Sequence, residues 1–218
     1  MLRASDQTGS ETRTMQNLRG AQKLAAVMLA WLLSIQASLA DPLHKFGNDG
    51  AYRHEHSGWI YPRRIGGLEL VGAPYTIDGN NDVGAEYARV VDGMRSTAVV
   101  DVYFADSAAI GAQLATAKAA MQTNAMAGGV AELQSEGRFV VDQPPELVGA
   151  KASYTSRVGT DGSQSVLYFF QTAAWVVTIR TTAQATDTQA GAALDEFVRA
   201  LRWDTLGTDP GNLHGAAK

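Results

Sequence analysis

The sequence predicts an α+β domain in which an antiparallel sheet of about six to seven strands is covered by two long helices. Three observations support this prediction. Strand-like segments follow one another in runs, with turn-forming residues between them. Only two segments of the expected domain show helical periodicity. The 218 residues, of which 45% are hydrophobic and 18% charged, have the composition of a globular protein.

The expected strands and helices follow from the spacing of apolar residues. Asp92-Gly93 is typical of a tight hairpin turn between two strands. Ile110, Leu114 and Met121 recur at helical spacing. The strands are expected over residues 65–73, 83–91, 98–104, 138–142, 148–158, 165–172 and 175–182. The helices are expected over residues 108–127 and around the apolar stripe of Leu194, Phe197, Val198 and Leu201.

The N-terminal part of the chain has the pattern of a secretory signal peptide. Residues 24–33 form an apolar run that follows two basic residues and precedes the small residues Ser38 and Ala40. A membrane-spanning helix needs about 20 apolar residues, and this run ends too early. We therefore expect cleavage near Ala40 and a periplasmic or secreted mature protein with no membrane span.

Composition then divides the chain into four parts. We expect an N-terminal extension with the signal peptide over residues 1–40 and a polar N-terminal segment over 41–64. A single α+β domain follows over 65–204. Residues 205–218 are polar and rich in glycine, which predicts a disordered tail.

Charge and cysteine content exclude several classes of function. The formal net charge is -4, and the expected leader carries four basic but only two acidic residues, so its removal makes the protein more acidic. Such a balance disfavours contact with a phosphate backbone, and we expect no nucleic acid partner. The sequence has no cysteine, which excludes disulfides, thiolate metal sites and cysteine nucleophiles.

The sequence lacks the common signatures of catalysis. It has no Gly-x-Ser-x-Gly segment and no serine three residues before a lysine, which are signatures of serine hydrolases. It also lacks the glycine-rich phosphate-binding loop that ends in Lys-Ser or Lys-Thr. We assign no catalytic residue and no cofactor, and we lean towards a protein that is not an enzyme.

Three histidines near the mature N-terminus form a candidate metal site. On an extended strand His54 and His56 project to the same side, and His44 or Asp49 would have to fold back to join them. The alternative is a solvated polar segment. A metal site here would suit a metal-dependent enzyme of the cell envelope, which is the alternative to a binding protein.

The next residues form a candidate ligand-binding surface. Trp59 and Tyr61 alternate on one face of the chain and precede Arg63 and Arg64. If exposed, these residues would provide a stacking platform with a cationic rim for an anionic ligand. Alternatively, the two aromatic side chains pack at the edge of the core.

Several segments carry a resemblance to a known group of proteins. The order of the elements and the closing segment FVRALRW at residues 197–203 resemble the PsbP/Mog1/DcrB-like superfamily. The segments SGWIYP (57–62), GGL (66–68) and DVGAEY (82–87) resemble those of exported bacterial proteins. The resemblance implies a layered fold and a binding or assembly role, with no catalytic residues.

The sequence therefore favours a non-enzymatic periplasmic binding or assembly module whose partner is an envelope protein or an anionic ligand. The alternative is a metal-dependent or other enzyme of the envelope. The two hypotheses differ in one observable feature. An enzyme would bring three or more titratable side chains together in an open pocket.

Overall fold

The computed structural model describes residues 43–77, 82–105, 110–123, 131–143, 146–158, 161–172 and 174–207. The expected signal peptide, the turn at residues 78–81 and the tail after residue 207 lie outside these residues. Within the described part of the chain, no helix is long and apolar enough to cross a membrane.

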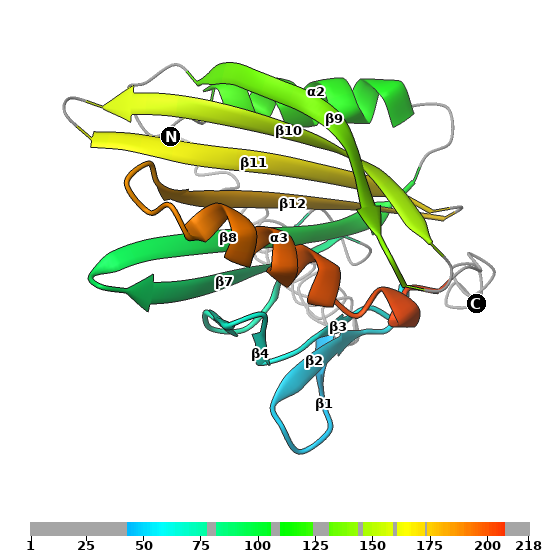
Figure 1. Ribbon diagram of the computed structural model, residues 1–218. Helices are drawn as coiled ribbons and strands as arrows, with labels where there is room; N and C mark the ends of the chain where they lie inside the picture. Colours follow the sequence, from blue (N-terminus) through cyan, green and yellow to red (C-terminus); the bar gives the residue numbers. More distant parts are fainter. Residues whose placement is uncertain are drawn as a thin grey trace, which may run out of the picture. The chain divides into compact units, whose positions relative to one another are not determined.

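Nine antiparallel strands form the main sheet (Figure 1). In spatial order eight of them run β4-β5-β7-β8-β12-β11-β10-β9, and β6 pairs with β7. Their bounds are β4 Arg64–Ile65, β5 Leu68–Leu70, β6 Tyr75–Thr76, β7 Val83–Val91, β8 Met94–Phe104, β9 Glu132–Val141, β10 Leu147–Val158, β11 Asp161–Gln171 and β12 Trp175–Gln184. Because β12 lies between β8 and β11, strands far apart in the sequence form the centre of the sheet.

A second, three-stranded sheet is formed by the polar N-terminal segment. Its strands are β1 (Leu43–Phe46), β2 (Ala51–His54) and β3 (Ile60–Tyr61), paired antiparallel in that order. The end of the described chain is attached to this sheet, since the Gly207 amide donates to the Ser57 carbonyl at 2.7 Å. Residues 205–207 therefore belong to the folded domain rather than to the expected tail.

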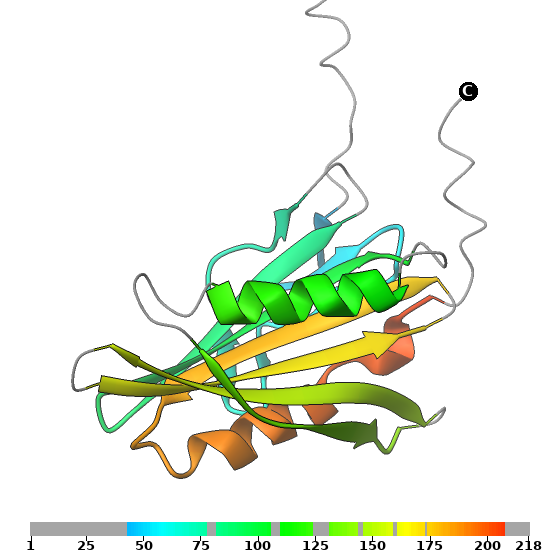
Figure 2. The same cartoon turned by 90° about the horizontal axis from the view of Figure 1, so that it is seen from above.

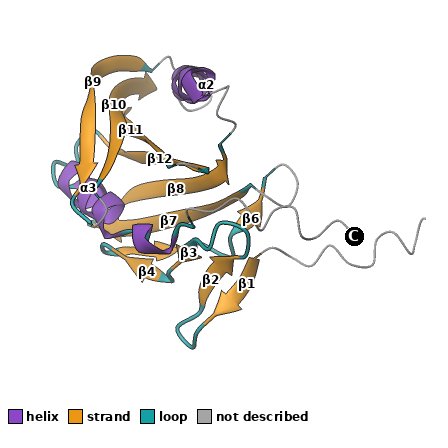
Figure 3. Ribbon diagram, turned by 90° about the vertical axis from the view of Figure 1, so that its right-hand side faces the viewer, coloured by secondary structure: helices purple, strands orange, loops and turns teal. Residues whose placement is uncertain are grey.

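Two α-helices lie on opposite faces of the main sheet (Figures 2 and 3). They are α2 (Ile110–Thr123) and α3 (Ala190–Ala200), and a short 3-10 helix, η1 (Trp203–Thr205), follows α3. Successive residues of a strand point to opposite faces. On β11, Tyr168 belongs to the apolar cluster that contains α3, whereas its neighbour Leu167 belongs to the cluster that contains α2.

The face covered by α3 holds the main core. Leu194, Phe197 and Val198 of α3 are buried there, as predicted, and the Phe197 ring lies 5.1 Å from that of Tyr87 on β7. Gly66 permits this close packing, because a Cβ there would lie 2.7 Å from the Phe197 Cα. Its φ of +53° also lies in the left-handed region that favours glycine.

The predicted α+β class with six to seven strands is wrong. Twelve strands in two antiparallel sheets hold 55% of the described residues, and helices hold 19%. Two local causes account for four of the five additional strands, and the fifth is the two-residue β6, which pairs with β7. The polar segment 41–64, expected to be irregular, pairs with itself through its backbone as β1, β2 and β3. The expected strand 65–73 turns back at Gly66 and Gly67, both at positive φ, so that it forms β4 and β5.

Candidate functional site

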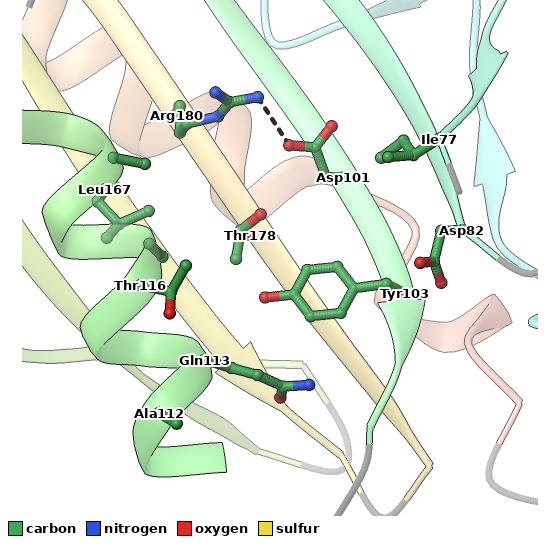
Figure 4. Close-up of a pocket in the computed structure, with 12 residues that line it drawn as sticks. Ile77, Asp82, Asp101, Tyr103, Ala112, Gln113, Thr116, Leu167, Thr178 and Arg180 are labelled. Atoms are coloured by element: carbon green, nitrogen blue, oxygen red, sulfur yellow. Dashed lines mark hydrogen bonds and ion pairs between the residues drawn. The ribbon is translucent and has the colours of Figure 1, made fainter. Parts of the chain in front are cut away.

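An open hollow lies between α2 and the main sheet, and we call it the α2 groove (Figure 4). It is an open cavity of about 530 Å³. Its lining residues are Ile77, Asp82, Asp101, Tyr103, Ala112, Gln113, Thr116, Ala117, Ala120, Leu167, Thr178 and Arg180.

The floor of the groove comes from the alternation of side chains along two paired strands. Asp101 and Tyr103 of β8 lie on the α2 face, as do Thr178 and Arg180 of β12, and Thr178 is directly opposite Asp101 in the register. The residues between them point the other way, and Val102 and Ile179 are fully buried in the main core. Each strand therefore supplies an apolar face to the core and a polar face to the groove.

The wall of the groove is an alanine-rich helix. Ala112, Ala117 and Ala120 of α2 face the cavity together with Gln113 and Thr116. Because an alanine side chain reaches only one carbon from the helix, these residues leave open space that leucine or phenylalanine would occupy.

An ion pair lies on the floor of the groove. An Arg180 guanidinium nitrogen, Nη2, is 2.9 Å from Asp101 Oδ2, and the Tyr75 hydroxyl donates to Asp101 Oδ1 at 3.4 Å. Asp101 is only 8% exposed, and burial raises the pKa of its carboxyl while Arg180 acts in the opposite direction. Gly84 permits this arrangement, because a Cβ there would lie 2.6 Å from Asp101 Oδ1.

Tyr103 projects into the cavity beside this pair. Burial, followed by the negative charges of Asp101 and Asp82, raises the pKa of its hydroxyl to about 12. The phenol therefore keeps its proton at neutral pH and can donate a hydrogen bond. Asp82 is held at the end of β8, where its Oδ1 accepts from the Phe104 amide at 3.3 Å.

On the opposite wall, Gln113 has a buried polar atom that needs a partner. Its Oε1 is buried and has no hydrogen-bond partner among the described residues. An unsatisfied buried acceptor costs about 1 to 3 kcal/mol.

The aromatic pair expected as a stacking platform is buried instead. Trp59 and Tyr61 do share a face, with ring centroids 6.3 Å apart, but both side chains lie in the main core with no exposed surface. Trp59 packs edge-on to Trp203 at 5.2 Å, and the Tyr61 hydroxyl donates to the Val83 carbonyl at 3.2 Å. Both rings therefore belong to the core together with their polar atoms, and a ligand cannot stack on them in this structure.

Arg63 and Arg64 are exposed, as the sequence hypothesis required. They line a hollow of about 370 Å³ together with Asp49, Pro62 and Glu69. Arg64 forms an ion pair with Glu69 across the β4–β5 turn. The two acidic side chains offset the two arginines, so this surface has no clear excess of positive charge.

The three histidines are not brought together as one site. His54 is buried, and its Nδ1 is 2.7 Å from the Ser57 hydroxyl, whereas exposed His44 lies 3.9 Å from Glu55. The His54 and His56 ring centroids are 5.6 Å apart. In the described ranges, no three His, Cys, Asp or Glu side chains form a group that could hold a metal ion.

Sequence reasoning missed every residue of the α2 groove, although a signal was present. Asp101 interrupts the apolar strand AVVDVYF, and Arg180 interrupts WVVTIRTT. Charged residues are seldom buried unless they are paired, so one charge of each sign within two apolar strands indicates a shared site.

Comparisons with known proteins add no family, since no family model matches the sequence and no curated protein is significantly similar to it.

Proposed function

We propose that this protein is an exported binding module of the cell envelope that holds a small ligand in the α2 groove. One observation carries the proposal, namely the open cavity of about 530 Å³ that places apolar side chains opposite a few converging polar groups. Ligand sites in proteins are commonly cavities of this size and make-up. The signal-peptide pattern of residues 24–40 supports export.

Binding is favoured over catalysis by the arrangement of the charged groups. Arg180 and the Tyr75 hydroxyl both contact Asp101, which limits its freedom to exchange a proton with a substrate. The raised pKa of the Tyr103 hydroxyl keeps this group protonated, which suits recognition better than proton abstraction.

An acid–base enzyme is the second candidate, because the groove brings Asp82, Asp101, Tyr103 and Arg180 together in an open pocket. Burial raises the pKa of Asp101, as is common for a general acid. Prolonged incubation separates the two candidates. After incubation with the wild-type protein, a binding module returns its ligand unchanged. An enzyme converts the ligand, and the Asp101→Asn variant then fails to convert it.

Blocking the groove tests the proposed function. Thr116 and Ala115 are neighbours on α2 and both are exposed, but only Thr116 lines the cavity. Thr116→Trp is therefore the test variant, and Ala115→Trp is its matched control. We expect small molecules from an envelope extract to shift the amide NMR signals of β8 and α2 in the wild type and the control, but not in Thr116→Trp. Equal shifts in all three proteins would contradict the proposal.

The exported state has a separate test. Mass spectrometry of the native envelope fraction should find a mature chain that begins at Asp41. A mature chain that retains residues 24–33 would show that the leader is not removed.

A further inference from the structure

We propose that the α2 groove binds an organic cation, namely an amine attached to an apolar body. This inference rests on the proposed function, because it names the ligand class of the same cavity. The charges, the hydrogen-bonding groups and the apolar surface of the groove each support it.

The charged side chains of the groove favour a cation. Two carboxylates, Asp82 and Asp101, line the cavity against one guanidinium, that of Arg180. Arg180 is engaged by Asp101 at 2.9 Å, so its positive charge is largely offset. Burial contributes most to the raised pKa of the Tyr103 hydroxyl, and the negative charges of Asp101 and Asp82 raise it further, so both carboxylates act on the group that projects into the cavity in Figure 4.

The hydrogen-bonding groups favour a donor-rich ligand. Gln113 Oε1 is a buried acceptor with no partner among the described residues, and the Thr116 and Thr178 hydroxyls line the same cavity. Figure 4 shows Gln113 and Thr116 on α2 facing Tyr103 and the carboxylates on the other side. A primary ammonium offers three donors and no acceptor, and the carboxylates and threonine hydroxyls of the groove can accept from it.

The apolar lining favours a ligand with a hydrocarbon or aromatic body. Leu167 of β11 and the alanines of α2 form one side of the cavity, and Ile77 forms part of another. The Tyr103 ring adds an aromatic face, which attracts a cation that lies over it. A small hydrated metal cation would leave this apolar surface unused, so an organic amine is the better match.

The first experiment compares three probes that share a phenethyl body and differ in the head group, namely phenethylammonium, hydrocinnamate and phenethyl alcohol. Binding is followed by the amide NMR shifts of β8 and α2 at low salt. We expect the amine to bind about tenfold more tightly than the carboxylate, with the alcohol between them.

Charge variants link this preference to the groove. Asp82→Asn retains an oxygen that can accept from the Phe104 amide and removes one negative charge. Glu132→Gln removes one charge from an exposed position on β9 that does not line the groove. We expect Asp82→Asn to reduce the preference for the amine about threefold and Glu132→Gln to leave it unchanged. An equal effect of the two variants would attribute the preference to net charge and overturn the inference.

The failures of this inference and of the proposed function can be told apart. If hydrocinnamate or the alcohol binds as tightly as the amine, or if none of the three probes binds, the inference is overturned. The proposed function is tested separately, by whether envelope molecules shift the NMR signals of Ala115→Trp but not those of Thr116→Trp.

A second experiment measures the potential in the groove without any ligand, and it is clean because the chain has no cysteine. Thr116→Cys and Ala115→Cys each react with methanethiosulfonates that carry either a trimethylammonium or a sulfonate group. The ratio of the two rates cancels differences in thiolate content. We expect the ratio of the rate with the cationic reagent to the rate with the anionic reagent to be about threefold higher for Thr116→Cys than for Ala115→Cys. An equal or reversed ratio would contradict a cation site.

Discussion

The two faces of the main sheet differ in how completely a helix covers them. The α3 face is covered by large side chains such as Leu194 and Phe197, which fill the space above the strands and leave the underlying residues buried. The α2 face is covered by alanines, and its apolar contacts form two small clusters around Met121 and Val176. One sheet can thus support a stable core on one face and a cavity on the other, and side-chain size decides which face is which.

The largest expected effect is the loss of a large side chain from the α3 face. Phe197→Ala should lower the free energy of unfolding by about 3 to 5 kcal/mol, because it leaves a cavity in the main core. The matched variant on the α2 face is Leu114→Ala, which removes a partly buried side chain and should cost about 1 kcal/mol. Urea denaturation measures both values, and similar losses would show that the two faces are packed alike.

A smaller effect is expected where α3 approaches the sheet most closely. Gly66→Ala adds a methyl group 2.7 Å from the Phe197 Cα and also strains a residue at positive φ, so it should cost about 3 kcal/mol. Gly67→Ala is the control, because Gly67 also has a positive φ but has no atom within 4 Å of the added Cβ. It should cost about 1 kcal/mol, and an equal loss would show that close packing against α3 does not matter.

The next effect concerns the buried carboxyl of the α2 face and depends on pH. Because the pKa of Asp101 is raised above 3.8 by burial, the folded protein binds this proton more readily than the unfolded chain does. The wild type should therefore gain stability relative to Asp101→Asn, by up to about 1 kcal/mol, as the pH falls through the raised pKa towards 3.8. Glu132→Gln controls for the loss of one charge, and a change in the opposite direction would mean that the ion pair with Arg180 outweighs burial.

The smallest effect concerns metal content. His54 is held by Ser57 on the buried side of the small sheet, so we expect zinc and calcium to copurify at less than one ion per chain. His54→Ala with His56→Ala should not change that content. Elemental analysis that finds one bound ion per wild-type chain, lost in this double variant, would contradict the expectation.

Local periodicity predicted most of the larger elements well, although β9 begins at Glu132 rather than at residue 138. The expected segment 83–91 coincides with β7, and the hairpin to β8 turns at Asp92, as its sequence indicates. The two expected helices correspond to α2 and α3, and the predicted stripe of α3 is buried. On α2, Met121 is buried and Leu114 partly so, while the side chain of Ile110 lies outside the described residues.

The short strands were not predictable in the same way. The strands β1, β3, β4 and β6 hold two to four residues each, which is too few for alternation to be recognised. They are specified by backbone pairing with neighbouring strands rather than by a pattern of their own. Similarly, Trp59 and Tyr61 have the same pattern whether they face solvent or Trp203, so only packing decided that they are buried.

The sequence by itself determined the alternation of β8 and β12, the alanine-rich composition of α2 and the apolar stripe of α3, because each depends on neighbours within a few residues. Only the tertiary structure decided that Asp101 and Arg180, which are 79 residues apart in the chain, meet on the floor of one groove. That meeting depends on β12 pairing with β8 rather than with another strand. Such a choice reflects the free energy of the whole sheet, and no local pattern encodes it.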